Sequence, residues 1–146
     1  MDDEYDLLQD NKTWDIVSLP SERKLVQCKW IYKTKLAAYV SNTKYKVWLV
    51  AKGYSQVHGM KYNKTFSPVA RMDSIRMVLA IATSKKWEVH HMDVKSAFLY
   101  GDLEEEIYMR QPEGYIEDSS LVWKLRKSLY GLKQAPWPWY AKMDSF

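Results

Sequence analysis

Two segments in the first third of the chain alternate between apolar and basic residues, which is the pattern of strands with one buried face. In residues 28–35, the pattern places Trp30 and Tyr32 on one face and several lysines on the other. Those lysines are Lys29, Lys33 and Lys35. Residues 44–51 repeat the pattern, with Tyr45, Val47, Leu49 and Ala51 expected to face inward and Lys44, Lys46 and Trp48 outward. The alternation predicts two strands that share a basic outer face.

The remaining pattern predicts a mixture of helices and strands. Further strands are expected at residues 13–19, 87–92, 107–109 and 121–125, a loop at 53–69, and a short helical or irregular turn at 95–100. Helices are expected at residues 4–8, from Asp73 as N-cap to about Lys85, and at 135–146 with Pro136 in the first turn. The middle helix carries Ile75, Val78, Leu79 and Ala82 at amphipathic spacing. The predicted fold class is therefore α+β.

Composition narrows the function classes. A chain of 146 residues with 47% hydrophobic residues can bury one core, and its one cysteine, Cys28, excludes an internal disulfide and a zinc ribbon. No apolar run reaches the roughly 20 residues of a membrane span, and the acidic start is unlike a secretory signal, so an intracellular location is expected. The net charge of +4 has its lysines crowded in the first half. They could face a phosphate backbone or be ordinary solvated residues.

One carboxylate, Asp93, follows the expected strand 87–92 and precedes small residues, where a metal ligand could meet solvent and substrate. Taken alone, an aspartate at such a position is more commonly a turn former or a helix cap. His90 and His91 do not make it a metal triad, because neighbouring strand residues point to opposite faces. The run Glu104 to Glu106 is expected to be a solvated turn, and the serines and histidines do not have the spacing of a nucleophile and its base.

The order of motifs carries more information than any one residue. Along the chain it is Trp14, Leu19-Pro20, Lys29-Trp30, Lys46, 49–54, Gln56, 66–71, Ile75-Arg76, Trp87, 93–99, Tyr108-Met109, 111–114 and 129–136. This order resembles the reverse transcriptase of copia-type LTR retrotransposons almost continuously from residue 4 to residue 146. The resemblance implies the fingers (roughly 11–72) and the first half of the palm (roughly 73–146) of a right-hand polymerase fold, ending before the second catalytic signature.

The resemblance also implies roles at matching positions. Asp93 would be the first metal-binding and catalytic aspartate, with the main-chain carbonyl of Val94 beside a Mg²⁺ or Mn²⁺ ion. Lys46, Phe98 and Tyr130 would bind the incoming nucleotide, with Phe98 disfavouring a 2′-hydroxyl; the alternative for Phe98 is a core position. Gly131 and Lys133 would contact template and primer. The implied partners are an RNA or DNA template-primer, dNTPs and other parts of a polyprotein, in the cytoplasm or a virus-like particle and without a membrane.

Several positions depart from the family pattern. The family usually has arginine at Trp48 and Trp137, Asp-Gly at Tyr39-Val40, aspartate at Lys61 and a small residue at Pro138. No pair of adjacent aspartates follows Asp93, so this chain alone is predicted to be inactive as an RNA-directed DNA polymerase. The alternative is a decayed, non-catalytic remnant or a recruited module that binds nucleic acid or protein.

Overall fold

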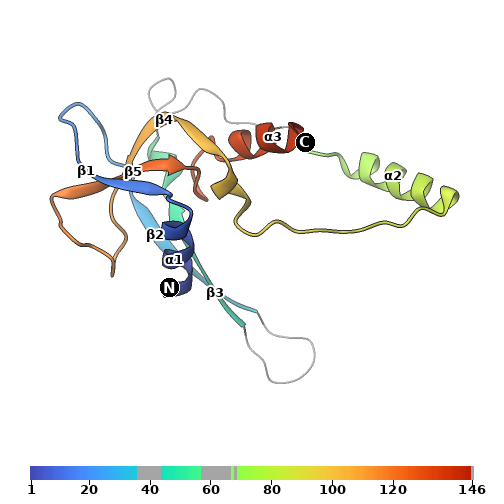
Figure 1. The fold of residues 1–146 in the computed structure, drawn as a ribbon, viewed down its shortest axis with the longest axis horizontal. Helices are drawn as coiled ribbons and strands as arrows, with labels where there is room; N and C mark the ends of the chain where they lie inside the picture. Colours follow the sequence, from blue (N-terminus) through green and yellow to red (C-terminus); the bar gives the residue numbers. More distant parts are fainter. Residues whose placement is uncertain (36–43, 57–66, 68, 146) are drawn as a thin grey trace.

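The computed structural model describes residues 1–35, 44–56, 67 and 69–145, and it combines helices with two antiparallel sheets (Figure 1). The elements in chain order are α1 (Asp2–Asp10), β1 (Trp14–Ser18), β2 (Cys28–Lys35), β3 (Lys44–Ala51), the 3₁₀ turn η1 (Gly53–Ser55), α2 (Met72–Lys85), the 3₁₀ turn η2 (Ala97–Tyr100), β4 (Asp102–Met109), β5 (Leu121–Lys127) and α3 (Pro136–Asp144). This mixture confirms the α+β class.

The larger sheet has the strand order β1-β5-β4, and the smaller one is the hairpin β2-β3. In the larger sheet Trp14 lies opposite Leu125, and Met109 lies opposite Trp123. Val26, just before β2, is bonded to the end of β4: its main-chain N–H donates to the carbonyl of Tyr108 at 2.8 Å, and its carbonyl accepts from Arg110 at 2.9 Å. The residue just before the hairpin is therefore fixed to the edge of the larger sheet.

The core lies between the two sheets and is closed by α1. Its buried members are Leu8, Val26, Leu49, Ala51, Leu99, Ile107, Met109, Trp123, Leu125, Leu129, Leu132 and Ala135. Trp14 and Trp123 stack with their ring centroids 3.6 Å apart, and Tyr5 of α1 stacks on Tyr115 at 4.2 Å. The helix α1 begins two residues before the predicted segment 4–8 and ends two residues after it, because Leu8 and Tyr5 anchor the whole helix on this aromatic layer.

The hairpin β2-β3 has the predicted bounds, and its register places Lys33 opposite Lys46 and Ile31 opposite Trp48. The predicted inward face is only partly correct. Leu49 and Ala51 are buried, but Tyr45 is 78% exposed, because the hairpin extends beyond the core (Figure 1). Tyr39, Val40 and Lys61 lie outside the described residues.

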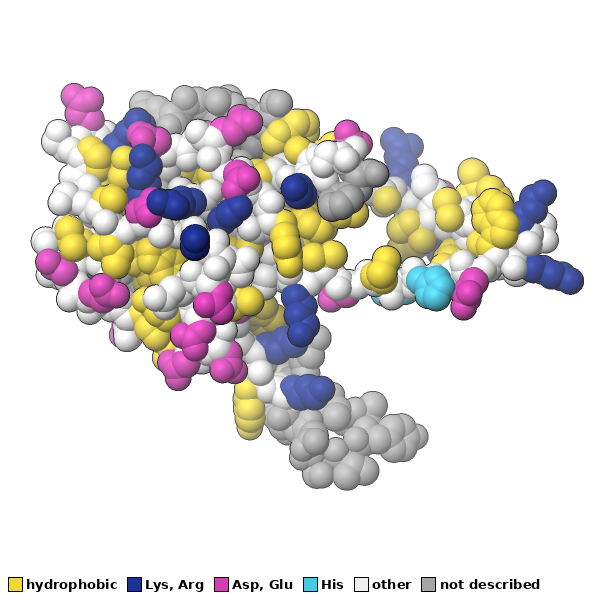
Figure 2. All heavy atoms as spheres, viewed as in Figure 1, with side chains coloured by type: hydrophobic (Ala, Val, Ile, Leu, Met, Phe, Trp, Pro, Cys, Tyr) yellow, Lys and Arg dark blue, Asp and Glu magenta, His cyan; other side chains and the backbone are white. Residues whose placement is uncertain are grey.

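The helix α2 starts at Met72, with Arg71 in the extended conformation before it, so Asp73 lies in the first turn and the predicted N-cap was wrong by two residues. A carboxylate in this turn still favours the helix dipole. The amphipathic face does not pack on the core: Val78 is 65% exposed and only Ala82 is buried. Figure 2 shows α2 projecting from the body with hydrophobic side chains on its surface.

The predicted strand 87–92 is absent. Residues 87–94 form an extended, exposed connection from α2 toward η2, and Trp87 is 64% exposed. The reason is physical: a strand needs a neighbour to satisfy its main-chain groups, and none of the described strands pairs with this segment. Alternation alone therefore overestimated this element.

The strand β4 is longer than the predicted segment 107–109, and Glu104 to Glu106 lie within it rather than in a solvated turn. Glu106 accepts hydrogen bonds from Lys124 at 2.7 Å and from Arg23 at 2.8 Å, which lowers the pKa of its carboxyl. A register shift between Asp102 and Ile107 accommodates the run. The strands β1 and β5, the turn η2 and the helix α3 fall where the pattern predicted them, within one or two residues at nearly every end.

Candidate nucleotide and nucleic-acid site

Asp93 and Val94 lie on the exposed connection between α2 and η2. Among the residues that the structure describes, no group of three His, Cys, Asp or Glu side chains could hold a metal ion. The predicted metal site therefore does not fit a Mg²⁺ ion in this arrangement, since Asp93 is a single carboxylate in solvent. Ser96, three residues after Asp93, has a φ of 51°, which is unusual for a residue with a side chain, and it turns the chain into η2.

Phe98 and Tyr130 lie against each other, and the prediction that both bind a nucleotide stays a prediction. Their ring centroids are 4.6 Å apart at an interplanar angle of 69°, an edge-to-face contact. Phe98 comes from η2 and is half-buried, whereas Tyr130 begins the turn after β5 and is 40% exposed. Both rings line a cavity of about 10 Å³, which Asp93 and Lys46 do not line.

The cavity below these rings is mostly apolar but is also lined by polar side chains. Ser128 lines it with an Oγ atom that is buried and has no hydrogen-bond partner. Glu4 of α1 also lines it, and burial raises the pKa of its carboxyl. A space of this size holds about one water molecule and no nucleotide. Sequence reasoning missed both residues, since neither belongs to a motif that marks a site.

Gly131 has a structural reason to be glycine in this fold. Its φ is +89°, and a Cβ atom there would lie 2.1 Å from the main-chain oxygen of Ala51. The adjacent carbonyl of Tyr130 accepts the N–H of Ala51 at 2.8 Å. The turn after β5 therefore packs with its main chain directly on the end of β3. The predicted contact between Gly131 and template or primer stays a prediction.

Lys133 follows in the same turn and is bonded to Gln56, which comes just after η1. Its main-chain N–H donates to the Oε1 atom of Gln56 at 2.9 Å, and its Nζ atom donates to the main-chain oxygen of Gln56 at 3.2 Å. Gln56 in turn donates to the side chain of Gln134. In the sequence, Gln56 is only one member of the motif order. No hydrophobic pattern around it predicts that its side chain is buried.

Lys46 lies on the basic face of the hairpin. Lys29, Lys33, Lys44 and Lys46 share this face and are exposed. In the described part of the chain, none of the four forms an ion pair. The half-buried Trp48 lies among them, opposite Ile31, so a partly apolar band interrupts the basic face. The face could bind a polyanion by charge alone.

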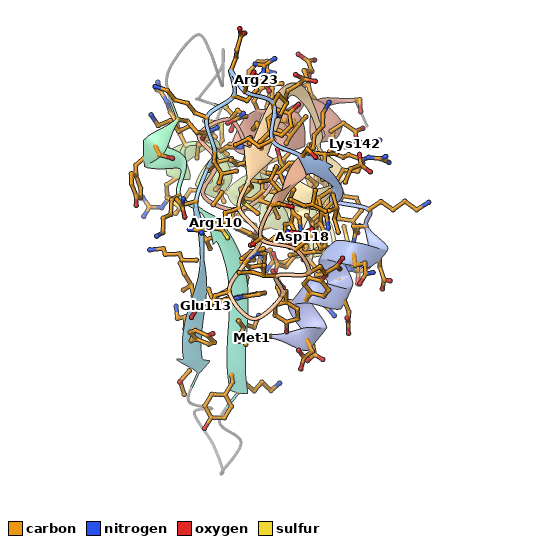
Figure 3. All side chains as sticks on the ribbon, turned by 90° about the vertical axis from the view of Figure 1, so that its left-hand side faces the viewer. Met1, Arg23, Arg110, Glu113, Asp118 and Lys142 are labelled. Atoms are coloured by element: carbon orange, nitrogen blue, oxygen red, sulfur yellow. The ribbon has the colours of Figure 1, made fainter. Side chains whose placement is uncertain are left out.

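A second cavity, of about 350 Å³, lies between η2, β4 and α3. Its lining includes Tyr100, Asp102, Trp137, Pro138 and Lys142, the last of which is labelled in Figure 3. None of the predicted site residues lines it. The structure thus brings together Phe98, Tyr130, Gly131 and Lys133, and it leaves Asp93, Val94 and Lys46 apart from them. In the described parts of the chain, no helix is long and apolar enough to cross a membrane.

Comparison with known proteins gives the family. The profile of the family described as "Reverse transcriptase (RNA-dependent DNA polymerase)" matches residues 11–146. The chain is 49% identical to the Retrovirus-related Pol polyprotein from transposon TNT 1-94 of Nicotiana tabacum, over all of this chain and 11% of that protein. It is 46% identical to the Pol polyprotein from transposon RE1 of Arabidopsis thaliana, over 93% of this chain and 10% of that protein.

A more distant relative is the Transposon Ty1-BL Gag-Pol polyprotein of Saccharomyces cerevisiae, 31% identical over 92% of this chain and 8% of that protein. The chain thus spans about a tenth of the length of the curated plant relatives it matches. No solved structure matches it significantly. The profile covers nearly the whole chain, including the segments that carry Asp93, Phe98 and the turn at Tyr130, and so this chain belongs to the reverse transcriptase family of retrotransposon Pol polyproteins.

Proposed function

We propose that residues 4–146 form the fingers and the first half of the palm of an RNA-directed DNA polymerase. In complete form such an enzyme copies RNA into DNA by nucleotidyl transfer that uses two divalent metal ions. The family profile and the Pol polyprotein relatives support this assignment. The boundary between the two parts is proposed near residue 72, where α2 begins.

The observation that carries the proposal is the basic face of the hairpin β2-β3. Lys33 and Lys46 lie directly opposite each other, and like charges in that position destabilise a strand pair. No acidic side chain in the described residues forms an ion pair with them. A phosphate backbone would neutralise this repulsion and release counterions. The hairpin therefore keeps a charge arrangement that favours binding of nucleic acid over stability.

The roles of single residues belong to the same proposal. Phe98 and Tyr130 would lie beside the incoming nucleotide, Lys46 near its triphosphate, and Gly131 and Lys133 beside template and primer. Asp93 and the carbonyl of Val94 would contribute to a Mg²⁺ or Mn²⁺ site once further carboxylates join them.

The chain alone is proposed to be inactive as a polymerase, since Asp93 is a single exposed carboxylate. This isolation also favours the second candidate, a non-catalytic remnant or recruited module that keeps only the basic surface. Other parts of a polyprotein are the proposed partners, in the cytoplasm or in a virus-like particle.

Binding of a fluorescein-labelled RNA–DNA hybrid at increasing salt tests the proposal. The logarithm of the association constant should fall linearly with the logarithm of salt concentration, with a slope of about −0.9 per phosphate neutralised. Lys33→Gln with Lys46→Gln should reduce the slope by about two such steps. The matched control, Lys85→Gln with Lys86→Gln, removes the same charge at the C-terminal end of α2 and should leave the slope unchanged.

Equal loss in both double variants would mean that net charge, and not the hairpin face, carries the binding. A parallel assay with Mg²⁺, dNTPs and a primed template tests the proposed inactivity of the chain alone. Neither wild type nor Asp93→Ala is expected to extend the primer. Extension by the wild type that Asp93→Ala abolishes would disprove the proposed inactivity.

A further inference from the structure

A buried pair of amides joins the end of the hairpin to the turn after β5. Gln56 is 3% exposed and Gln134 is 2% exposed, although both side chains are polar. The Nε2 atom of Gln56 donates to the Oε1 atom of Gln134 at 3.0 Å. Buried amides are costly unless they are hydrogen-bonded, so such a contact fixes its partners in one arrangement.

The same side chain holds the main chain of the turn. The Oε1 atom of Gln56 accepts the N–H of Lys133 at 2.9 Å, so both ends of the amide are used across this joint. Lys133 closes a second link from its Nζ atom to the main-chain oxygen of Gln56. The position of Lys133 is therefore set by Gln56 from two directions.

The rest of the joint includes two very close contacts between main-chain groups. A Cβ atom on Gly53 would lie 2.0 Å from the main-chain oxygen of Gly131, and a Cβ atom on Gly131 would lie 2.1 Å from that of Ala51. These contacts bring the two segments together but carry few directional bonds. The directional hydrogen bonds of the Gln56 amide fix how the two segments are oriented.

This joint links two parts of the proposed nucleic-acid surface. The hairpin with Lys33 and Lys46 leads into η1 and Gln56, and the turn held by Gln56 carries Tyr130 and Lys133. The distance between the basic face and the turn thus depends on this contact. An apolar side chain at position 56 could fill the same space but could not fix the main chain of Lys133.

We propose that Gln56 is a positioning residue, which holds Lys133 and the turn 130–134 at a fixed place relative to the lysines of the hairpin, so that one phosphate backbone contacts both. The inference rests on the proposed function of the surface. Gln56 itself touches no nucleic acid and acts through Lys133.

The test uses the full chain and the same fluorescein-labelled RNA–DNA hybrid. Lys133→Ala should weaken binding and reduce the salt slope by about 0.9, the value for one phosphate. Gln56→Leu should reproduce that loss, and the double variant should bind no more weakly than Lys133→Ala alone. Gln27→Leu, which changes an exposed glutamine before β2, is the matched control and should bind as the wild type does. Circular dichroism confirms that each variant is folded at the assay temperature.

A purely structural role would leave the slope of folded Gln56→Leu unchanged or make its effect additive with Lys133→Ala, and either result overturns the inference. If Gln56→Leu does not fold, Gln56→Asn keeps a buried amide that is one methylene too short to reach Lys133. It should show the same reduced slope and the same lack of additivity, and an unchanged slope overturns the inference equally. When Lys133→Ala weakens binding and the Gln56 variants do not, the inference alone fails. Absence of salt-dependent binding by the wild type refutes the proposed function and this inference with it.

Discussion

At the scale of single residues, two glycines with the same φ distinguish the cost of a strained backbone from the cost of a steric clash. Gly131 and Gly114 both have a φ of +89°. A Cβ atom on Gly114 would meet nothing within 4 Å, whereas one on Gly131 would meet the oxygen of Ala51 at 2.1 Å. Gly114→Ala should therefore cost only about 1 to 2 kcal/mol of conformational free energy. Gly131→Ala should cost about 3 to 4 kcal/mol, because β3 and the turn must also move apart.

Urea unfolding followed by circular dichroism measures both free energies of unfolding. Equal losses in the two variants would mean that the turn can move away from β3 without cost. Such a result would also remove the rigid joint on which the role of Gln56 depends. A larger loss in Gly131→Ala supports the close contact independently of any nucleic acid.

The same residue shows how far the sequence could lead. The resemblance predicts a glycine at position 131 because a side chain would push nucleic acid away, whereas the structure shows the main-chain oxygen of Ala51 close to it. Its partner could not be predicted, because a sequence does not state what the main chain approaches. Here it is Ala51, some 80 residues earlier in the chain. Gln56 poses the same difficulty, since its burial follows from that long-range contact.

At the scale of elements, local patterns predicted the strands that have partners. Alternation located β2 and β3 correctly, because each strand supplies the other with hydrogen-bond partners. It failed at 87–92, where the same kind of pattern lies beside no other described strand. It also shortened β4, since three successive glutamates hide a strand that pairs with β5 through Lys124. Alternation shows that a segment could be a strand, but it does not show whether the fold supplies a neighbouring strand to pair with it.

The helix α3 shows that an irregular residue can be harmless in the right place. The helix starts at Pro136, so Pro138 lies in the first turn, where main-chain N–H groups have no acceptor within the helix. Pro138→Ala should change stability by less than about 1 kcal/mol. The alanine in this variant also keeps the Cβ atom of residue 138, which packs over Gly101. Ala141→Pro, one turn further on, should cost about 3 kcal/mol.

Urea unfolding monitored at far-ultraviolet wavelengths compares the two variants. If Pro138→Ala stabilises the protein by as much as Ala141→Pro destabilises it, then Pro138 strains the helix, and its departure from the family pattern is a structural lesion. A small change in Pro138→Ala with a large loss in Ala141→Pro would place the proline where the backbone tolerates it.

At the scale of the whole molecule, the chain consists of a packed body and an arm. The body contains every member of the buried hydrophobic cluster, and none of them comes from α2. Figure 3 shows how the sheets, α1 and the N-terminus gather in this body, with Met1 and Glu113 near the hairpin. The arm exposes the apolar residues Met72, Ile75, Met77, Val78, Leu79 and Ile81. An exposed apolar patch of this kind on a protein surface favours association.

We expect the purified chain to self-associate through α2. Ile75→Lys with Val78→Glu places opposite charges on that face without changing the net charge. This variant should sediment as a monomer at concentrations where the wild type forms larger species. The matched control, Ile116→Lys with Leu19→Glu, makes the same exchange at two exposed apolar positions on the body and should associate as the wild type does.

Sedimentation velocity over a range of concentrations distinguishes the possible origins of association. If both double variants become monomers, general surface hydrophobicity drives association and α2 has no special part in it. If neither does, the contact lies elsewhere, and the open edges of the sheets become the next candidates. Because no residue of the core comes from α2, the thermal midpoint of the body should be the same in the variant and in the wild type when both are measured at a dilution where they are monomers. A lower midpoint in the variant would show that the arm packs on the body in solution, contrary to the exposed α2 described above.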